Sequence, residues 1–227
     1  DRIAEGLVQA DLYRAGDVVA SVLPMSHAFG LEHAFLAPLL AGACVRQFDA
    51  FGDAFAEEVA RCGATVLPVV PAAALALARQ PNAGTRLRLA ITAGSPLSPQ
   101  ARAEWQASMR VELVDLYGAT EVGTIWLDRG DGGVPMPGVE VQLVRADTPD
   151  HVVACQPGDE GEIAVRTPTA ARRIVAPVPG EPLLQEGWFR TGDLGVACGA
   201  HRWRIVGRSK LIFDVAGRKV NPYEVEA

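Results

Sequence analysis

The C-terminal part of the chain carries Asp193, Arg208, Lys210 and Lys219, in that order, within three glycine-containing clusters, Gly187–Gly195, Trp203–Lys210 and Gly217–Glu226. The first cluster holds Asp193 in a Thr-Gly-Asp sequence, and a carboxylate in a tight turn can accept hydrogen bonds from both hydroxyls of a ribose. In the second cluster Arg208 follows a short apolar run and can add a charged donor to the same sugar. These residue types, in this order, indicate a nucleotide site.

A second block with chemical potential is Tyr117–Glu121, which follows the apolar run Val111–Leu116. Gly118 lets the backbone approach a ligand closely. The hydroxyl of Thr120 can bind a phosphate oxygen, and the carboxylate of Glu121 can hold a magnesium ion. A block this short also occurs as an ordinary turn at the end of a strand, so its weight comes from its position ahead of the C-terminal clusters.

Two further loops follow apolar runs. In the first, Pro24–Gly30, His27 could contact a bound carboxylate or gate a tunnel, although a lone His is more often a surface or hydrogen-bonded residue. The second contains Gly94, Ser95 and Pro96, whose small side chains leave room for a flat ring against the backbone. A plain turn explains this second loop equally well.

In order and spacing, these blocks resemble the adenylate-forming superfamily of acyl- and aryl-CoA synthetases, luciferase-like ligases and nonribosomal adenylation domains. Gly187–Gly195 resembles the signature GWFxTGDxG, and Gly207–Glu226 resembles GRxKxxIxxxGxxVxPxEVE. Tyr117–Glu121 resembles YGxTE, and Pro24–Gly30 resembles PLFHxxG. One position departs, because Phe213 stands where the second signature has Ile.

The resemblance implies a role for each matching residue. Tyr117 would stack on adenine, Thr120 would contact the α-phosphate, and Glu121 would ligate magnesium. Asp193 and Arg208 would bind the ribose.

Other roles implied by the resemblance concern the acyl side and the C-terminal lobe. Gly94, Ser95 and Pro96 would line the adenine and acyl pocket, and Gly118 would belong to the nucleotide site. Lys210 would be the hinge at which the C-terminal lobe swings between adenylation and thioester formation. Lys219 would either approach the thiol-transfer site or be a solvated lysine, and both interpretations stay open.

The implied activity is ATP-dependent activation of a carboxylic acid as an acyl-adenylate, with release of pyrophosphate. Transfer to the thiol of CoA or of a carrier-protein phosphopantetheine would follow. The expected cofactors and co-substrates are therefore ATP, Mg2+ and CoA or phosphopantetheine, and the expected partners are a small carboxylic acid and, in one alternative, an acyl carrier protein. Two other functions remain open, an amino-acid-activating adenylation domain and a non-catalytic nucleotide-binding or scaffold module.

The substrate class can be narrowed by one missing residue type. Amino-acid-activating domains carry an Asp near His27 to pair the substrate amine, and this chain has no Asp between Asp17 and Asp49. Glu32 is the only nearby acid and is interpreted as a helix-start residue. We therefore expect an amine-free acid, fatty or aryl, in an apolar pocket lined partly by Ala28–Phe35 and Val66–Ala74.

The positions of the lysines indicate whether the chain contains every part of the superfamily's fold. Of 21 basic residues only Lys210 and Lys219 are lysines, so no lysine lies between Asp1 and Ser209. The superfamily's phosphate-binding loop, which ends in a lysine, and its catalytic lysine near the end of the small lobe therefore have no match. The sequence predicts a fragment that lacks this loop and most of the C-terminal lobe.

Charge and composition exclude several classes of protein. The formal net charge of −6 argues against a nucleic-acid surface, although it allows one local basic site. The sequence contains no run of about 18 apolar residues, so no membrane span is expected. Cys44, Cys62, Cys155 and Cys198 have no metal-ligand spacing and predict reduced thiols in a cytoplasmic protein.

The elements that must position these residues alternate between strand and helix as far as Leu116. Strands are expected at Asp17–Leu23, Ala43–Phe48, Thr65–Val70, Leu87–Thr92 and Val111–Leu116. Helices are expected at Ile3–Tyr13, Leu31–Leu40 with a kink at Pro38, Phe51–Arg61, Pro71–Arg79 and Pro99–Ser108. This alternation is typical of an α/β fold with a mostly parallel sheet covered on both faces, and ligands bind beyond the carboxyl ends of such strands.

After Glu121 the pattern changes to short strands separated by Pro and Gly. Strands are expected at Val139–Val144, Gly161–Arg166 and Arg202–Val206, with a loop at Thr167–Glu186, which predicts a small antiparallel β-barrel-like subdomain. The predicted organisation is an α/β subdomain at residues 1–124, part of a large N-terminal domain, and a distorted barrel at 125–206. Residues 207–227 would form the hinge and the truncated start of the C-terminal lobe.

Overall fold

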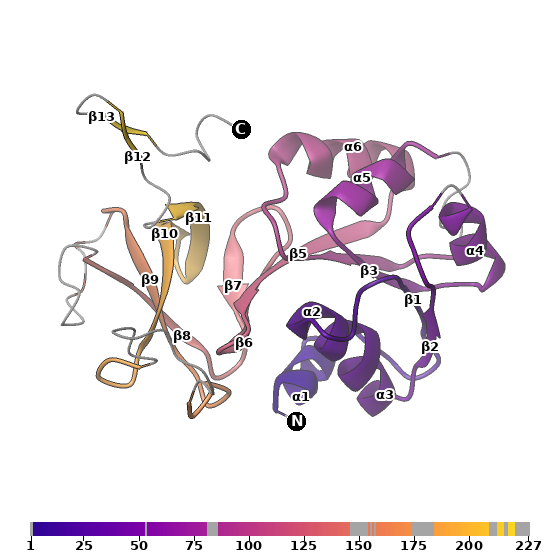
Figure 1. Ribbon diagram of the computed structural model, residues 1–227, viewed down its shortest axis with the longest axis horizontal. Coiled ribbons are helices and arrows are strands. Elements are labelled where there is room, and N and C mark those ends of the chain that lie inside the picture. Colours follow the sequence, from indigo (N-terminus) through magenta and orange to yellow (C-terminus); the bar gives the residue numbers. More distant parts are fainter. Residues whose placement is uncertain are drawn as a thin grey trace. The chain divides into compact units, whose positions relative to one another are not determined.

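The computed structural model divides the chain into two compact units (Figure 1). Unit 1 comprises Asp1–Gly118 and Leu127–Gly130, and unit 2 comprises Ala119–Trp126 and Asp131–Ala227. The structure describes residues 2–52, 54–80, 86–145, 154, 156, 158–173, 184–208, 213–215 and 218–220.

Unit 1 contains a parallel sheet whose strand order is β2-β1-β3-β4-β5. The strands are β1 (Val18–Ser21), β2 (Cys44–Gln47), β3 (Val66–Val69), β4 (Leu89–Thr92) and β5 (Glu112–Ala119). Every residue of β3 and β4 is buried, as expected of apolar runs covered on both faces. Figure 1 shows α5 and α6 on one side of these strands and α1, α2 and α3 on the other.

The helices of unit 1 largely follow the expected positions. They are α1 (Arg2–Gln9), α2 (Ala28–Leu31), a π-helical turn (Glu32–Leu36), α3 (Ala37–Ala41), α4 (Phe55–Arg61), α5 (Pro71–Ala78) and α6 (Pro99–Met109). Helix α6 begins at a cap in which the Ser98 hydroxyl accepts a hydrogen bond from the Ala101 N–H at 3.1 Å. Its Trp105 is fully buried and donates from Nε1 to the Val111 carbonyl at 2.9 Å.

Two helices differ from the prediction for local reasons. The first helix ends at Gln9 instead of Tyr13, because Asp11 takes a left-handed conformation with a φ of 59°. The helix expected at Leu31–Leu40 begins earlier, at Ala28, and widens into the π-helical turn before α3. Pro38 then lies in the first turn of α3, where its missing N–H costs no hydrogen bond.

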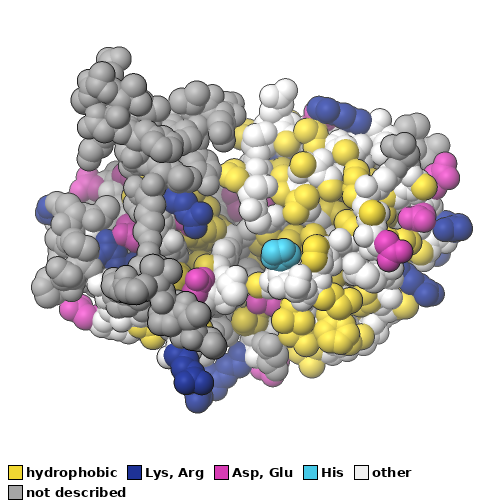
Figure 2. Space-filling view, in the orientation of Figure 1, with side chains coloured by type: hydrophobic (Ala, Val, Ile, Leu, Met, Phe, Trp, Pro, Cys, Tyr) yellow, Lys and Arg dark blue, Asp and Glu magenta, His cyan; other side chains and the backbone are white. Residues whose placement is uncertain are grey.

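This helical segment leaves apolar side chains at the surface. Leu31, Phe35, Leu39 and Leu40 are exposed although they are large and hydrophobic. Figure 2 shows apolar side chains gathered on the face of unit 1 near α2.

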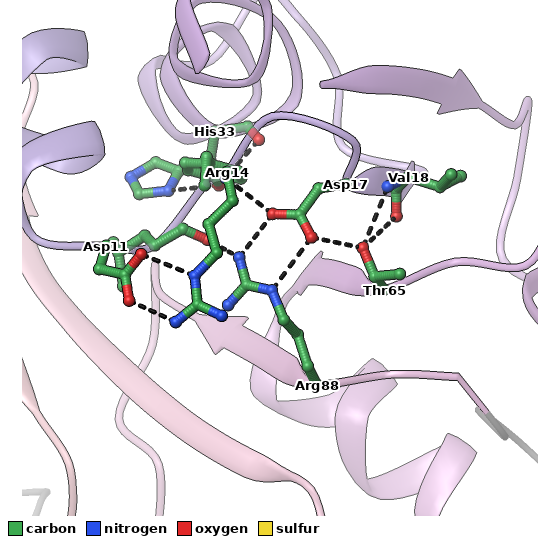
Figure 3. A network of polar contacts seen from close by, with 9 residues as sticks. Asp11, Arg14, Asp17, Val18, His33, Thr65 and Arg88 are labelled. Carbon is green, nitrogen blue, oxygen red and sulfur yellow. Dashed lines mark hydrogen bonds and ion pairs between the residues drawn. The ribbon is translucent and has the colours of Figure 1, made fainter. Parts of the chain in front are cut away.

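A polar network joins the amino ends of three strands of unit 1 (Figure 3). Asp17, just before β1, accepts hydrogen bonds from Arg88 Nε at 3.0 Å, Arg88 Nη2 at 2.5 Å and Thr65 Oγ1 at 2.7 Å. The backbone N–H of Arg14 donates to the same carboxylate at 2.8 Å. Because Thr65 precedes β3 and Arg88 precedes β4, one buried carboxylate ties these strand ends together.

Unit 2 contains an antiparallel sheet in the order β7-β11-β10-β9-β8. These strands are β7 (Gly133–Pro135), β8 (Glu140–Val144), β9 (Gly161–Arg166), β10 (Phe189–Gly199) and β11 (Arg202–Arg208). Strand β6 (Gly123–Asp128) contains the point at which the chain leaves unit 2 for Leu127–Gly130. A separate antiparallel pair consists of β12 (Phe213–Val215) and β13 (Arg218–Val220).

The α/β class is confirmed and the strands of unit 1 pair in parallel as expected, but the sheet as a whole is mixed and not mostly parallel. The described strands form a mixed sheet of eleven strands, in which pairing is parallel among β1–β5 and antiparallel among β7–β11. The antiparallel strands after Glu121 were expected in a separate subdomain, and their place in the same sheet makes that sheet mixed. The barrel-like description is not confirmed. Among the described residues, no helix is long and apolar enough to cross a membrane.

Candidate functional site

The loops that follow the parallel strands of unit 1 leave the sheet at one edge. In register, Val69 of β3 lies beside Thr92 of β4, and Thr92 lies beside Asp115 of β5. Parallel strands that end in register place their following loops together. Gly94, Ser95 and Pro96 are exposed in the loop after β4. Tyr117 and Gly118 were expected in a loop but lie within the last residues of β5, where Tyr117 is half-buried and Gly118 is exposed.

His27 lies in a turn whose shape depends on a glycine. The His27 N–H donates to the Pro24 carbonyl at 3.1 Å, and the Leu31 N–H donates to the His27 carbonyl at 2.9 Å. A Cβ on Gly30 would lie 2.1 Å from the Pro24 carbonyl oxygen, so no other residue fits without opening the turn. The turn leaves His27 exposed immediately before α2.

A partly buried Thr–Asp pair at the same edge was not predicted from the sequence. Thr92 Oγ1 donates to Asp115 Oδ1 at 2.7 Å, two residues before Gly94 and Tyr117. Burial raises the pKa of Asp115 to about 6, and the hydrogen bond from Thr92 partly opposes this shift. The sequence signal that could have revealed this pair is a polar residue near the end of each of two consecutive apolar strands, Thr92 and Asp115.

Glu32 was interpreted as a helix-start residue, and this interpretation is wrong. Its side chain is buried, with 9% of the residue's surface exposed, in the π-helical turn. It forms no hydrogen bond or ion pair with any residue that the structure describes, and burial raises its pKa to about 7. The adjacent His33 is fully buried, and its Nδ1 lies 3.0 Å from the Tyr13 hydroxyl. Burial lowers the pKa of His33 to about 3.

The turn after β5 carries Thr120 and Glu121. Thr120 is exposed and Glu121 is half-buried. The turn is held by hydrogen bonds from the Val122 N–H to the Ala119 carbonyl at 3.0 Å and from the Ala171 N–H to the Glu121 carbonyl at 2.7 Å.

The described residues contain no group of three or more Asp, Glu, His or Cys side chains that could enclose a metal ion. Magnesium often binds through one or two carboxylates together with substrate phosphates. Glu121, a half-buried residue that follows the exposed Thr120 in sequence, has the side-chain chemistry for a site of that kind.

In unit 2, Asp193 of β10 and Arg208 of β11 are directly opposite each other in the antiparallel register. Arg208 Nε lies 3.1 Å from Asp193 Oδ1, with 15% of the Asp193 side chain and 51% of the Arg208 side chain exposed. The two residues expected to share one sugar are therefore in contact, with accessible surface remaining on both. Lys210, the predicted hinge, lies outside the described residues.

Comparisons with a family model and with individual proteins point to the same family. Residues 3–175 match the model of a family described as "AMP-binding enzyme". The anthranilate–CoA ligase of Pseudomonas aeruginosa is 33% identical over 226 residues, which cover 94% of this chain and 43% of that protein. The 4-coumarate–CoA ligase 1 of Arabidopsis thaliana is 27% identical over 235 residues, covering 95% of this chain and 41% of that protein.

Among solved structures, ATP-bound MatB from Rhodopseudomonas palustris superposes with a TM-score of 0.84 at 28% sequence identity. The match covers 98% of this chain and 46% of that structure. The chain therefore spans less than half the length of these relatives.

Proposed function

Because this chain belongs to the AMP-binding enzyme family, we propose that its protein activates a carboxylic acid with ATP and transfers the acyl group to a thiol. The observation that carries the proposal is the contact between Asp193 and Arg208. It lies beyond the family match at residues 3–175, and it joins a carboxylate and a guanidinium suited to ribose hydroxyls.

The nucleotide is assigned to the residues that the resemblance singled out. Tyr117 stacks on adenine with Gly118 beside it, and Asp193 and Arg208 bind the ribose. Thr120 contacts the α-phosphate.

The chemistry of the first step is the attack of the acid's carboxylate on the α-phosphorus, with pyrophosphate as the leaving group. Negative charge grows on the phosphate oxygens as the bond forms. Thr120 donates a hydrogen bond to one of these oxygens, and Glu121 would hold magnesium, which would supply further positive charge. The acyl group then passes to a thiol, for which CoA is favoured because the reported relatives are CoA ligases.

The acid is proposed to be aryl or fatty. The names of two relatives refer to aryl acids, anthranilate and 4-coumarate. Ala28–Phe35 and Val66–Ala74 are assigned to the acyl side, with Gly94, Ser95 and Pro96 beside the adenine and His27 near the carboxylate. The two alternatives, an amino-acid-activating domain and a non-catalytic module, are not favoured by these relatives.

We also propose that the chain is part of a longer protein. Its relatives are more than twice as long as the matched region, and the chain contains no phosphate-binding loop with a lysine. The rest of the polypeptide would supply that loop and the C-terminal lobe, which would swing at Lys210. The scattered cysteines support a cytoplasmic location.

Carboxylate-dependent exchange of pyrophosphate into ATP tests this function. The complete polypeptide and the 227-residue chain would be compared with a panel of aryl, fatty and amino acids. We expect exchange by the complete polypeptide with an aryl or fatty acid, and none by the chain alone. Exchange only with amino acids, or with no acid in either protein, would overturn the proposal.

A further inference from the structure

Strand β10 contains an irregularity immediately before Asp193. In the pairing with β9, Arg190 lies beside Ala164 and Leu194 lies beside Glu162. Three residues of β10, Thr191 to Asp193, therefore stand opposite the single residue Ile163 of β9. Bulges of this kind redirect a side chain, and here Gly192 takes a φ of 76°.

The bulge is tied to β9 by one carboxylate. Glu162 Oε1 accepts a hydrogen bond from the Gly192 N–H at 3.0 Å, and Glu162 Oε2 accepts one from Arg190 Nε at 3.0 Å. Arg190 Nη2 also contacts Oε2, so both oxygens are engaged on either side of Thr191. The side chains of Glu162 and Arg190 are only 10% and 12% exposed.

Thr191 provides the second attachment. Its hydroxyl donates to the Ile163 carbonyl at 3.0 Å and accepts from the Asp193 N–H at 3.1 Å. The backbone of Asp193 is thus fixed through Thr191, while Gly192 is fixed through Glu162. The Asp193 carboxylate emerges from this bulge opposite Arg208.

We propose that Glu162 is a positioning residue for nucleotide binding, which sets the direction of the Asp193 carboxylate through the Thr191–Asp193 bulge. This inference rests on the proposed function, because Asp193 must be the ribose ligand. A carboxylate that accepts from both ribose hydroxyls needs a fixed position, and small misplacements weaken such hydrogen bonds steeply.

The test compares two ligands that differ only at the sugar, AMP and 2′,3′-dideoxy-AMP. Affinities would be measured by titration calorimetry with the complete polypeptide that carries this chain. For the wild type we expect AMP to bind roughly 10- to 100-fold more tightly, the range for hydrogen bonds to a charged group. Glu162→Gln should lower the AMP affinity about tenfold and change the dideoxy-AMP affinity by less than about twofold.

Thr191 supplies a second variant pair in case Glu162→Gln does not fold. Thr191→Val removes the hydroxyl that holds Asp193 and should lose the preference for AMP, whereas Thr191→Ser keeps the hydroxyl and should retain the preference. Glu140→Gln is the matched control. Glu140, on β8, forms an exposed pair with Arg166, which lies on the same strand as Glu162, and Glu140 does not contact the bulge.

The outcomes separate the two hypotheses. A wild type without preference for AMP would show that Asp193 does not bind the ribose, which overturns the ribose assignment and this inference together. A wild-type preference that survives in Glu162→Gln and Thr191→Val overturns only the positioning role. An equal loss of both ligands in these variants would also overturn it, because it would show general destabilisation.

Discussion

Two aspartate–arginine pairs in this molecule have the same chemistry and opposite surroundings. Asp17 and Arg88 in unit 1 have side chains 6% and 26% exposed, and Asp193 and Arg208 in unit 2 have side chains 15% and 51% exposed. The Asp17 carboxylate accepts from two atoms of Arg88, from the Thr65 hydroxyl and from a backbone N–H. The hydrogen-bonding capacity of the Asp17 carboxylate is therefore used by donors within the fold. The Asp193–Arg208 pair, in contrast, keeps solvent-accessible surface that a ligand can reach.

The protonation of Asp17 reflects this arrangement. Burial alone would raise its pKa, but the hydrogen bonds from Arg88, Thr65 and the Arg14 N–H lower the pKa below its usual value. A buried carboxylate with this many donors stabilises the fold and does not bind a ligand, because a ligand would have to displace the donors. The comparison teaches that an ion pair indicates a binding site only where its accessible surface and its position in the sheet agree.

The largest expected effect comes from breaking the buried pair. Asp17→Ala removes the carboxylate that joins the amino ends of β1, β3 and β4, and it leaves the Arg88 guanidinium without its carboxylate partner, although Nη2 still donates to the Leu12 carbonyl. We expect a loss of about 3 kcal/mol in the free energy of unfolding, measured by urea denaturation. A loss too small to measure would show that the two pairs do not differ in their structural role.

Glu32 sharpens the comparison, because it is buried and no residue that the structure describes donates a hydrogen bond to its carboxylate. Its pKa is raised from 4.5 to about 7, so between these pH values only the unfolded chain releases the proton. The free energy of unfolding should therefore fall as pH rises from 4.5 to 7, by up to about 3 kcal/mol, and level off above that. The measurement is the difference in stability between the wild type and Glu32→Gln at each pH.

This difference also removes the contribution of His33. The pKa of His33 is lowered from 6.5 to about 3, so its contribution to stability falls as pH decreases through that interval. The His33 contribution to stability thus rises with pH, opposite to the Glu32 contribution, and it is present in both the wild type and Glu32→Gln. A difference between wild type and Glu32→Gln that does not vary with pH would contradict the raised pKa of the buried Glu32 carboxyl.

The accessible pair should respond in binding and not in stability. Asp193→Asn removes the charge that the ribose hydroxyls would contact, and we expect AMP affinity to fall roughly 10- to 100-fold. The free energy of unfolding should change by less than about 1 kcal/mol, because partly exposed pairs contribute little. A large loss of stability with unchanged affinity would reverse the roles of the two pairs.

The smallest effect is expected at an exposed pair. Arg166 Nε donates to Glu140 Oε1 at 3.1 Å, and both side chains are more than half exposed. Solvent and salt screen such a pair, so Glu140→Gln should leave urea denaturation and AMP binding unchanged within error. A clear loss of either would mean that exposure is a poor guide to the role of ion pairs in this protein.

The sequence predicted the elements whose signal is local. Strands β3 and β4 are buried at every position and apolar at all but Thr92, because both faces are covered, and Pro71 and Pro99 lie in the first turns of α5 and α6 as proline requires. The sequence did not predict β10. Its three glycines and its Thr-Gly-Asp sequence favour turns, and only the bulges against β9 and β11 let the chain continue as an eleven-residue strand.

The site was predictable to the extent that its residues follow one another in known blocks. Asp193 and Arg208 were assigned to one sugar, and they are in contact. Their pairing depends on a register with two irregularities, which no residue pattern encodes. Glu162 and the Thr92–Asp115 pair were missed because their partners are distant in sequence and meet only across neighbouring strands.

The buried indole of α6 gives unit 1 an optical signal of its own. Of the four tryptophans, Trp105 is the one that belongs to unit 1, while Trp126, Trp188 and Trp203 belong to unit 2. A variant that retains only Trp105 should emit at short wavelength and resist quenching by acrylamide until unit 1 opens, because the ring is out of contact with water. Fluorescence could then follow the unfolding of one unit while the other stays silent.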